Sequence, residues 1–233
     1  MNDIRTKDLL ARFRASGRKK VSLEKQFDPA YLPSDISEEQ AGELLRESLE
    51  RLAKYQDMLY AQNTHGLLII LQAMDAAGKD GVIKHVMTGL NPQGCQVYSF
   101  KAPSTEAQDH AYMWRCFKAL PDRGRIGIFN RSYYEEVLVV RVHPEILEKQ
   151  NIPAELKGKG IWKQRFADIN HFEQYLSNNG IQVLKIFLNV SKQEQKKRFL
   201  ARIERPEKNW KFAAGDAKER ALAGVSEGVR RDD

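Results

Sequence analysis

A short apolar run, Leu67–Leu71, is followed at once by a loop rich in small residues, Ala73–Gly81. A continuous aliphatic run of this length predicts a strand that is buried on both faces, as strands are in a parallel sheet. A new apolar stripe at helical spacing begins at Val82 and continues to Leu90. The sequence therefore predicts a buried strand, a tight loop and a helix in immediate succession.

The same alternation of strand and helix recurs along the chain. Further strands are expected at 96–100, 125–130 and 181–189, and helices at 37–59, 104–120, 161–178 and from Ser191 onward. Ser104 is expected to open the second of these helices and Pro121 to stop it. Ser191 and Glu194 have the spacing of a capping box. This order of elements predicts an α/β fold with a parallel sheet flanked by helices.

Composition excludes several classes of protein. Of the 233 residues, 42% are hydrophobic and 30% are charged, which is the ordinary globular mixture and not that of a disordered chain. The longest aliphatic run is too short to span a bilayer, and no apolar segment of a signal peptide precedes the first basic cluster. Cys95 and Cys116 are too few for a disulfide framework. We therefore expect a soluble, cytoplasmic protein without a membrane partner.

The chain carries an excess of positive charge. It has 38 Lys and Arg residues against 31 Asp and Glu residues, a formal net charge of +7. Such an excess favours polyanionic partners, which include nucleic acids, nucleotides and phosphate polymers. A solvated basic surface without a specific partner explains the charge equally well. Residues 1–37 are polar and basic and contain Pro29 and Pro33, so they are expected to form an arm with little core of its own.

The loop after the first strand has the features of a phosphate-binding loop. Such a loop needs small residues whose backbone N–H groups surround phosphate oxygens, a helix N-terminus behind them and a lysine that reaches the outer phosphates. The residues expected to contact phosphate are Ala76, Ala77, Gly78, Lys79, Asp80 and Lys84. Two positions depart from the usual pattern, because Ala73 replaces its first glycine and Asp80 replaces the Ser or Thr that holds Mg²⁺. The alternative is a tight turn with a solvated lysine.

Asp75 is an unusual residue inside such a loop. A carboxylate there repels phosphate unless a metal ion or a transferable proton intervenes. Asp75 is therefore a candidate for coordinating Mg²⁺ or for orienting the acceptor phosphate. The alternative is a loop residue that only hydrogen-bonds its own backbone.

A second group of polar residues, Asn130–Glu136, follows the strand expected at 125–130. Ligands of open α/β sheets bind outside the carboxyl ends of the strands, so Asn130 and Arg131 should meet Asp75 and Lys79 there. A carboxylate usually occupies this strand end and helps to hold Mg²⁺. Asn130 stands in its place, and Glu135 or Glu136 could supply the missing charge.

Three arginines share one face of the last predicted helix, at Arg198, Arg202 and Arg205. Three guanidinium groups on one face could clamp phosphates, as lids do in phosphoryl transfer. The alternative is a solvated basic face that pairs with Glu194 and Glu204.

Several longer motifs resemble the second polyphosphate kinase family, and the likeness runs from about Leu23 to Arg220. The motifs are Ala73–Gly81, Asn91–Gly94, Phe100–Pro103, Arg123–Glu136, Val140–Glu145 and Pro206–Phe212. Among the classes of the family they are most similar to the third, whose members use polyphosphate to phosphorylate both AMP and ADP. Other classes have Asp in place of Asn130 and Asn in place of Glu135, a pair that the resemblance links to AMP acceptance.

The resemblance implies a thymidylate-kinase-like P-loop core, a helical lid at about 191–212, Mg²⁺ as cofactor and a basic channel for inorganic polyphosphate. It implies reversible phosphate transfer between polyphosphate and AMP, ADP or ATP, by a homo-oligomer (dimer or tetramer) that binds no nucleic acid. The residues it places in the catalytic centre are Asp75, Lys79, Asn130, Arg131 and Glu135, with Asp75 at the metal and with Arg198 and Arg202 on the lid.

The resemblance also divides the chain. The phosphotransferase domain is expected at 38–222, and the tail at 223–233 lacks an apolar stripe and looks truncated beside the family pattern. Two other functions stay open. An ATP-dependent kinase of a small nucleotide, of the nucleoside monophosphate kinase type, would share the loop, the lid and the fold. The second is a non-catalytic module that binds polyanions. Only the net charge favours it, because the chain lacks the interleaved aromatic and basic residues of a surface that binds single-stranded nucleic acid.

Overall fold

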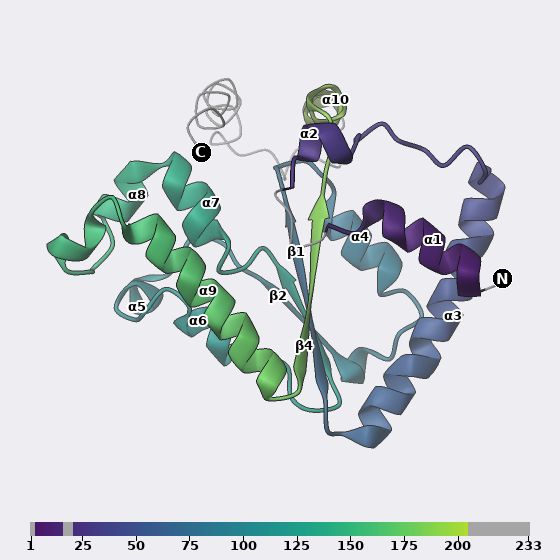
Figure 1. Ribbon diagram of the computed structural model, residues 1–233, viewed down its shortest axis with the longest axis horizontal. Helices are drawn as coiled ribbons and strands as arrows, with labels where there is room; N and C mark the ends of the chain where they lie inside the picture. The colour runs from purple at the N-terminus through teal and green to yellow at the C-terminus, as the bar shows by residue number, and fades with distance from the viewer. Residues whose placement is uncertain (1–2, 16–20, 205–233) are drawn as a thin grey trace.

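The computed structural model describes residues 3–15 and 21–204, and within that range it contains a four-stranded parallel sheet (Figure 1). The strands are β1 (Gly66–Ala73), β2 (Cys95–Ser99), β3 (Ile126–Asn130) and β4 (Ile181–Leu188). Their order across the sheet is β2-β3-β1-β4, and every pair is parallel. The four predicted strands and the α/β fold are therefore confirmed.

Helices cover both faces of this sheet. The helices of the described residues are α1 (Asp3–Phe13), α2 (Leu23–Gln26), α3 (Glu38–Gln62), α4 (Lys79–Val86), α5 (Thr105–Gln108), α6 (Trp114–Lys118), α7 (Glu135–Val142), α8 (Pro144–Glu148), α9 (Ile161–Asn178) and α10 (Lys192–Glu204). Two 3₁₀ helices, Pro92–Gly94 and Ala154–Lys157, lie in the connections. Figure 1 shows α3 and α4 on one side of the sheet and α5 to α9 on the other.

Strand β1 lies between β3 and β4, and its residues alternate between the hydrophobic cores on the two faces of the sheet. Leu68 and Ile70 pack with Ile169 and other residues on the α9 side. Leu71, the last residue of the apolar run, packs with Ile83 and other residues on the α3 and α4 side. Both faces of β1 are thus covered, which is the physical reason that its sequence is continuously apolar.

The predicted helix at 104–120 is wrong in one respect, because two short helices with a break between them occupy this segment. Ser104 opens α5 as expected, and its Oγ accepts a hydrogen bond from the backbone N–H of Ala107 over 3.2 Å. In the break, the guanidinium carbon of Arg165 lies over the ring of Tyr112, 5.0 Å from the ring centroid. Cys116 in α6 is fully buried in the α9-side core. Packing against α9 therefore overrides the local helical propensity.

A buried glutamine of α3 explains the motif Asn91–Gly94. Gln56 is 3% exposed, accepts a hydrogen bond from the backbone N–H of Asn91 and donates one to its carbonyl oxygen, both over 2.8 Å. A Cβ atom on Gly94 would lie 2.4 Å from Gln56 Nε2, so a larger residue there would displace the Gln56 amide from Asn91. These contacts join the turn before β2 to α3.

The N-terminal segment is mostly exposed, although it contains the helix α1, which the sequence did not predict. Arg12 donates hydrogen bonds to Tyr31 and Asp35, and the Phe27 carbonyl oxygen accepts one from Asn189 after β4. The boundaries of this arm stay a prediction. The tail at 223–233 and the lid beyond 204 lie outside the described residues. In the described ranges, no helix is both long enough and apolar enough to cross a membrane.

A buried ion pair joins the helices on the α9 side. Arg165 and Glu136 are each 4% exposed, and Arg165 Nη1 lies 3.0 Å from the Glu136 carbonyl oxygen and 3.4 Å from its carboxylate. Gln150 completes the network, because it donates to the Glu136 carboxylate and accepts from Arg165. The charges therefore have hydrogen-bond partners, which a buried ion pair requires.

Arg165→Met should lower the free energy of unfolding by about 3–5 kcal/mol, because it leaves a buried carboxylate without its cationic partner. Urea denaturation followed by circular dichroism measures the change. Arg46→Met is the matched control, since Arg46 pairs with Glu43 and Glu50 on the solvent side of α3 and its loss should barely move the midpoint. Equal, small effects of both variants would contradict the structural role of the buried pair.

Candidate phosphate-binding site

The loop between β1 and α4 is a tight turn with two residues in the left-handed region. Ala76 has a φ of 59°, and Gly78, the N-cap of α4, has a φ of 99°. An alanine rarely adopts this conformation, so its surroundings must hold it. Ala76 and Ala77 are buried, and the Ala77 N–H donates to the Met74 carbonyl oxygen. The loop thus leads into the N-terminus of α4, where backbone N–H groups favour an anion.

The lysine of the loop is buried. Lys79 is 9% exposed, and its Nζ donates a hydrogen bond to the Ala73 carbonyl oxygen over 3.0 Å. Burial lowers the pKa of Lys79, and the positive charge of Arg131 lowers it further, whereas the carboxylates around it oppose both effects. The alternative of a solvated lysine is therefore wrong. Lys84, by contrast, is exposed in the last turn of α4, and its predicted phosphate contact stays a prediction.

Asp75 and Arg131 form an ion pair across the carboxyl end of the sheet. Arg131 Nη2 lies 2.9 Å from Asp75 Oδ1, with the two side chains 38% and 24% exposed. Arg131 has a φ of 67°, and its backbone N–H donates to the Leu71 carbonyl oxygen. A left-handed non-glycine residue directly after a strand is the kind of backbone strain found at functional sites. The predicted meeting of the loop with the end of β3 is therefore observed.

Asn130 contacts the other acidic residue of the loop. Its Nδ2 donates a hydrogen bond to Asp80 Oδ1 over 2.8 Å and lies 3.4 Å from Ser99 Oγ at the end of β2. The amide thus joins the end of β3 to the first turn of α4. A carboxylate in its place would face Asp80 with the same charge, which raises the energy of both ionised groups.

The structure distinguishes the two candidate glutamates after β3. Burial raises the pKa of Glu135, while Arg131, hydrogen bonding from Gln72 and the charge of Lys79 lower it, so the Glu135 carboxylate lies near these groups. Glu136 instead belongs to the buried pair with Arg165. Glu135 is therefore the glutamate that lies at the candidate site.

Helix α10 contacts the loop from the side of β4. Arg198 Nη1 donates to the Ala77 carbonyl oxygen over 2.6 Å, and its Nε donates to Glu194 over 2.8 Å. Ser191 accepts a hydrogen bond from the backbone N–H of Glu194, as a helix N-cap does. Arg198 thus contacts the phosphate loop and also pairs with Glu194, the ion pair expected if this face of the helix were only a solvated basic surface. Arg202 also belongs to α10, but its side chain and the whole of Arg205 lie outside the described residues.

Sequence reasoning missed three groups at this site. Gln195 Nε2 donates to the Asp75 carbonyl oxygen over 2.7 Å, and Gln72 is buried directly before the loop. Glu173 of α9 accepts hydrogen bonds from both Tyr133 and Tyr134, which anchors the turn after β3. Uncharged glutamines carry no motif signal of their own. Only the position of Gln72, next to the loop, could have indicated it.

Comparison with known families matches residues 35–222 to the family described as Polyphosphate kinase 2 (PPK2). The chain belongs to the polyphosphate kinase 2 family. The resemblance found in the sequence motifs is thus confirmed, over a range that includes the loop, the strand ends and α10.

Two curated relatives of this polyphosphate kinase 2 chain illustrate the similarity. The ADP-polyphosphate phosphotransferase of Rhodopseudomonas palustris is 55% identical over 212 residues, which cover 89% of this chain and 72% of that protein. The AMP/ADP-polyphosphate phosphotransferase of Meiothermus ruber is 42% identical over 199 residues, which cover 85% of this chain and 70% of that protein.

A solved structure of the polyphosphate kinase 2 family has the same fold. The crystal structure of polyphosphate kinase 2 from Arthrobacter aurescens TC1 matches this chain with a TM-score of 0.79 and 39% identity, over 91% of this chain and 72% of that one. The P-loop kinase-like fold predicted from the sequence is therefore confirmed.

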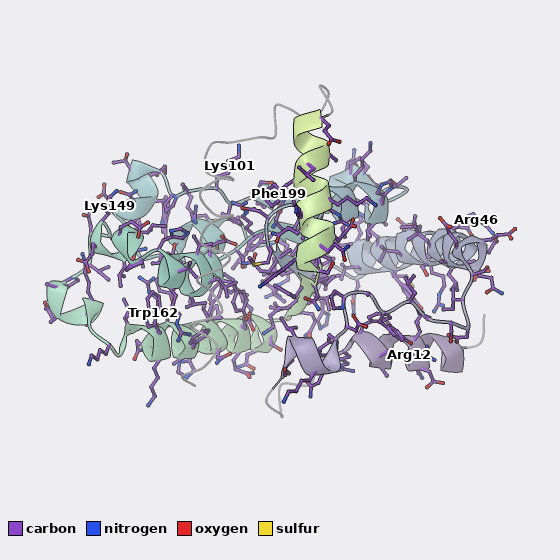
Figure 2. All side chains as sticks on the ribbon, turned by 90° about the horizontal axis from the view of Figure 1, so that it is seen from above. Arg12, Arg46, Lys101, Lys149, Trp162 and Phe199 are labelled. Carbon is purple, nitrogen blue, oxygen red and sulfur yellow. The ribbon has the colours of Figure 1, made fainter. Side chains whose placement is uncertain are left out.

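Lys79→Ala should lower the rate of phosphate transfer by about 100-fold or more, because a buried cation that stabilises developing phosphate charge is lost. The rate is measured on the purified variant after circular dichroism has verified folding. Lys149→Ala is the matched control, since Lys149 is exposed at the end of α8, distant from α10 in Figure 2. A folded Lys79→Ala variant with the parent's turnover would exclude the phosphate-loop assignment.

Proposed function

We propose that this chain transfers phosphate reversibly between inorganic polyphosphate and adenosine nucleotides, with ADP and AMP as acceptors. The observation that carries the proposal is the cluster of Lys79, Arg131 and Arg198 around a strand–loop–helix turn at the carboxyl end of the sheet. Both curated relatives are named for ADP, and that of Meiothermus ruber also for AMP. These names support the choice of acceptors.

The proposed roles follow from charge and position. Lys79 lies at the start of α4 and stabilises the transferring phosphate as a point charge, while Arg131 binds phosphate oxygens through its planar guanidinium. Asp75 holds Arg131 in place through their ion pair. Asn130 keeps Asp80 in the first turn of α4. Phosphoryl transfer depends chiefly on positioning and charge stabilisation, which are what these residues supply.

Phosphotransferases of this family generally need a divalent cation, and we assign Mg²⁺ to that role here. Mg²⁺ that accompanies phosphates keeps several waters and takes one or two protein carboxylates. The residues present fit that pattern, because Asp75 offers a partly exposed carboxylate in the loop. Asp75 would hold the ion. When bound, Mg²⁺ neutralises charge on the phosphates.

Helix α10 is proposed to bind the polyphosphate chain. Arg198 already lies against the loop, where it donates to backbone carbonyl oxygens. Phosphate oxygens accept stronger hydrogen bonds from a guanidinium than neutral carbonyl oxygens do. Arg198 therefore exchanges its loop contacts for phosphate when polyphosphate arrives, and Arg202 joins it from the same helix.

The experiment that tests the function is transfer by the full chain with long-chain polyphosphate and Mg²⁺. We expect ATP from ADP, measured by luminescence, and ADP from AMP, measured by chromatography. Mixtures with ATP as the donor and AMP as the acceptor are the matched control. Transfer from ATP but not from polyphosphate would instead identify an ATP-dependent nucleotide kinase. Binding of polyphosphate without transfer to any acceptor would identify a non-catalytic polyanion-binding module.

Glu135→Gln should depress the phosphorylation of AMP more than that of ADP. We infer that the Glu135 carboxylate, which lies near Arg131 and Lys79, orders water or the metal against the single phosphate of AMP, whereas ADP brings a second phosphate to do so. The ratio of kcat/KM for the two acceptors measures the effect. Equal loss on AMP and ADP, with unchanged assembly by light scattering, would remove the acceptor-selective role.

A further inference from the structure

Gln72 is a buried amide at the centre of the candidate site. It is the penultimate residue of β1 and is 7% exposed. Its Oε1 is fully buried and has no hydrogen-bond partner among the described residues. A buried polar atom without a partner costs stability, and an apolar side chain of the same size would avoid that cost. A polar group kept in such a place therefore needs a reason.

The other end of the amide faces the turn that connects β3 to α7. Gln72 Nε2 lies 3.5 Å from Ser132 Oγ, at the outer limit of a hydrogen bond, and hydrogen bonding from the Gln72 side chain lowers the pKa of the nearby Glu135. Ser132 is fully buried, and its carbonyl oxygen accepts a hydrogen bond from the Glu135 N–H over 3.1 Å. Gln72 thus joins β1 to both ends of this short turn.

That turn needs support from outside. It begins at Arg131, whose left-handed backbone is strained, and it carries both the guanidinium that pairs with Asp75 and the carboxylate of Glu135. Strained conformations persist only where their surroundings determine them. The amide of Gln72 supplies such a contact directly beneath the site.

We propose that Gln72 is a positioning residue of the phosphotransferase reaction, which holds the turn that carries Arg131 and Glu135 against the phosphate loop. This inference rests on the proposed function. Gln72 acts through Glu135 and Arg131 and does not itself contact the reacting phosphates.

The test is a double-mutant cycle with exchanged groups. Gln72→Glu keeps the side-chain volume but places a second carboxylate against Glu135, so kcat with ADP should fall by about 10- to 100-fold while KM changes little. In a Glu135→Gln background, the amide introduced at position 135 can donate to the carboxylate introduced at position 72, and the same substitution should cost less than about 3-fold. ADP is the acceptor because Glu135→Gln is expected to cost less activity toward ADP than toward AMP, so each loss from Gln72→Glu is measured relative to its own background.

Gln56→Glu is the matched control, since Gln56 is also a buried glutamine but joins α3 to Asn91 instead of the site. It should lower the thermal midpoint to the same extent in both backgrounds and leave kcat within about 2-fold of the parent. Equal losses of kcat for Gln72→Glu in both backgrounds would overturn the proposal and leave Gln72 a structural residue.

Urea unfolding of the parent, the two single variants and the double variant separates the proposed function from the proposed role of Gln72. It measures the coupling between positions 72 and 135 whether or not the chain is active. A parent without polyphosphate-dependent transfer would reject the proposed function, while additive unfolding energies would reject the contact itself. An active parent with additive effects on kcat would reject only the positioning role of Gln72.

Discussion

The parallel pairing of β1 with β3 places Leu71 opposite Asn130, and the candidate site depends on that register. Because both strands run in the same direction, the residues that follow each of them leave the sheet at the same edge. The loop that carries Asp75 and the turn that carries Arg131 therefore start side by side, and the Arg131 N–H donates to the Leu71 carbonyl oxygen. A shift of one residue would turn Gln72 to the opposite face of the sheet and separate it from Ser132.

Positive charges gather at this edge, and carboxylates limit the repulsion between them. Burial and the neighbouring Arg131 both lower the pKa of Lys79, so the charge of its ammonium group has an energetic cost. Asp75 and Glu135 oppose that effect from the loop and from the start of α7. The same arrangement suits a polyanion, because phosphate oxygens add the negative charge that the cations lack. Salt should accordingly weaken binding.

Helix α10 extends the site beyond the sheet. Gln195 and Arg198 lie one turn apart and donate to nearby carbonyl oxygens of the phosphate loop, at Asp75 and Ala77. These contacts engage the backbone of the loop, so they depend on its left-handed turn at Ala76 more than on its side chains. The helix proposed to act as the lid therefore already contacts the loop before phosphate binds. Phosphate would compete with the loop carbonyl oxygens for the guanidinium of Arg198.

The sequence alone determined the strands, the loop and the helices α3, α4, α9 and α10, because hydrophobic periodicity, glycine and capping residues act over a few positions. It also indicated that Asp75, Lys79, Asn130 and Arg131 would meet, since parallel strands end at one edge. Tertiary structure decided the rest. Packing of Tyr112 on Arg165 accompanies the break in the helix expected at 104–120, and the same Arg165 takes Glu136 away from the site. Gln72 and Gln195 became visible only in three dimensions, because an uncharged amide acquires its role from the partners that distant segments bring to it.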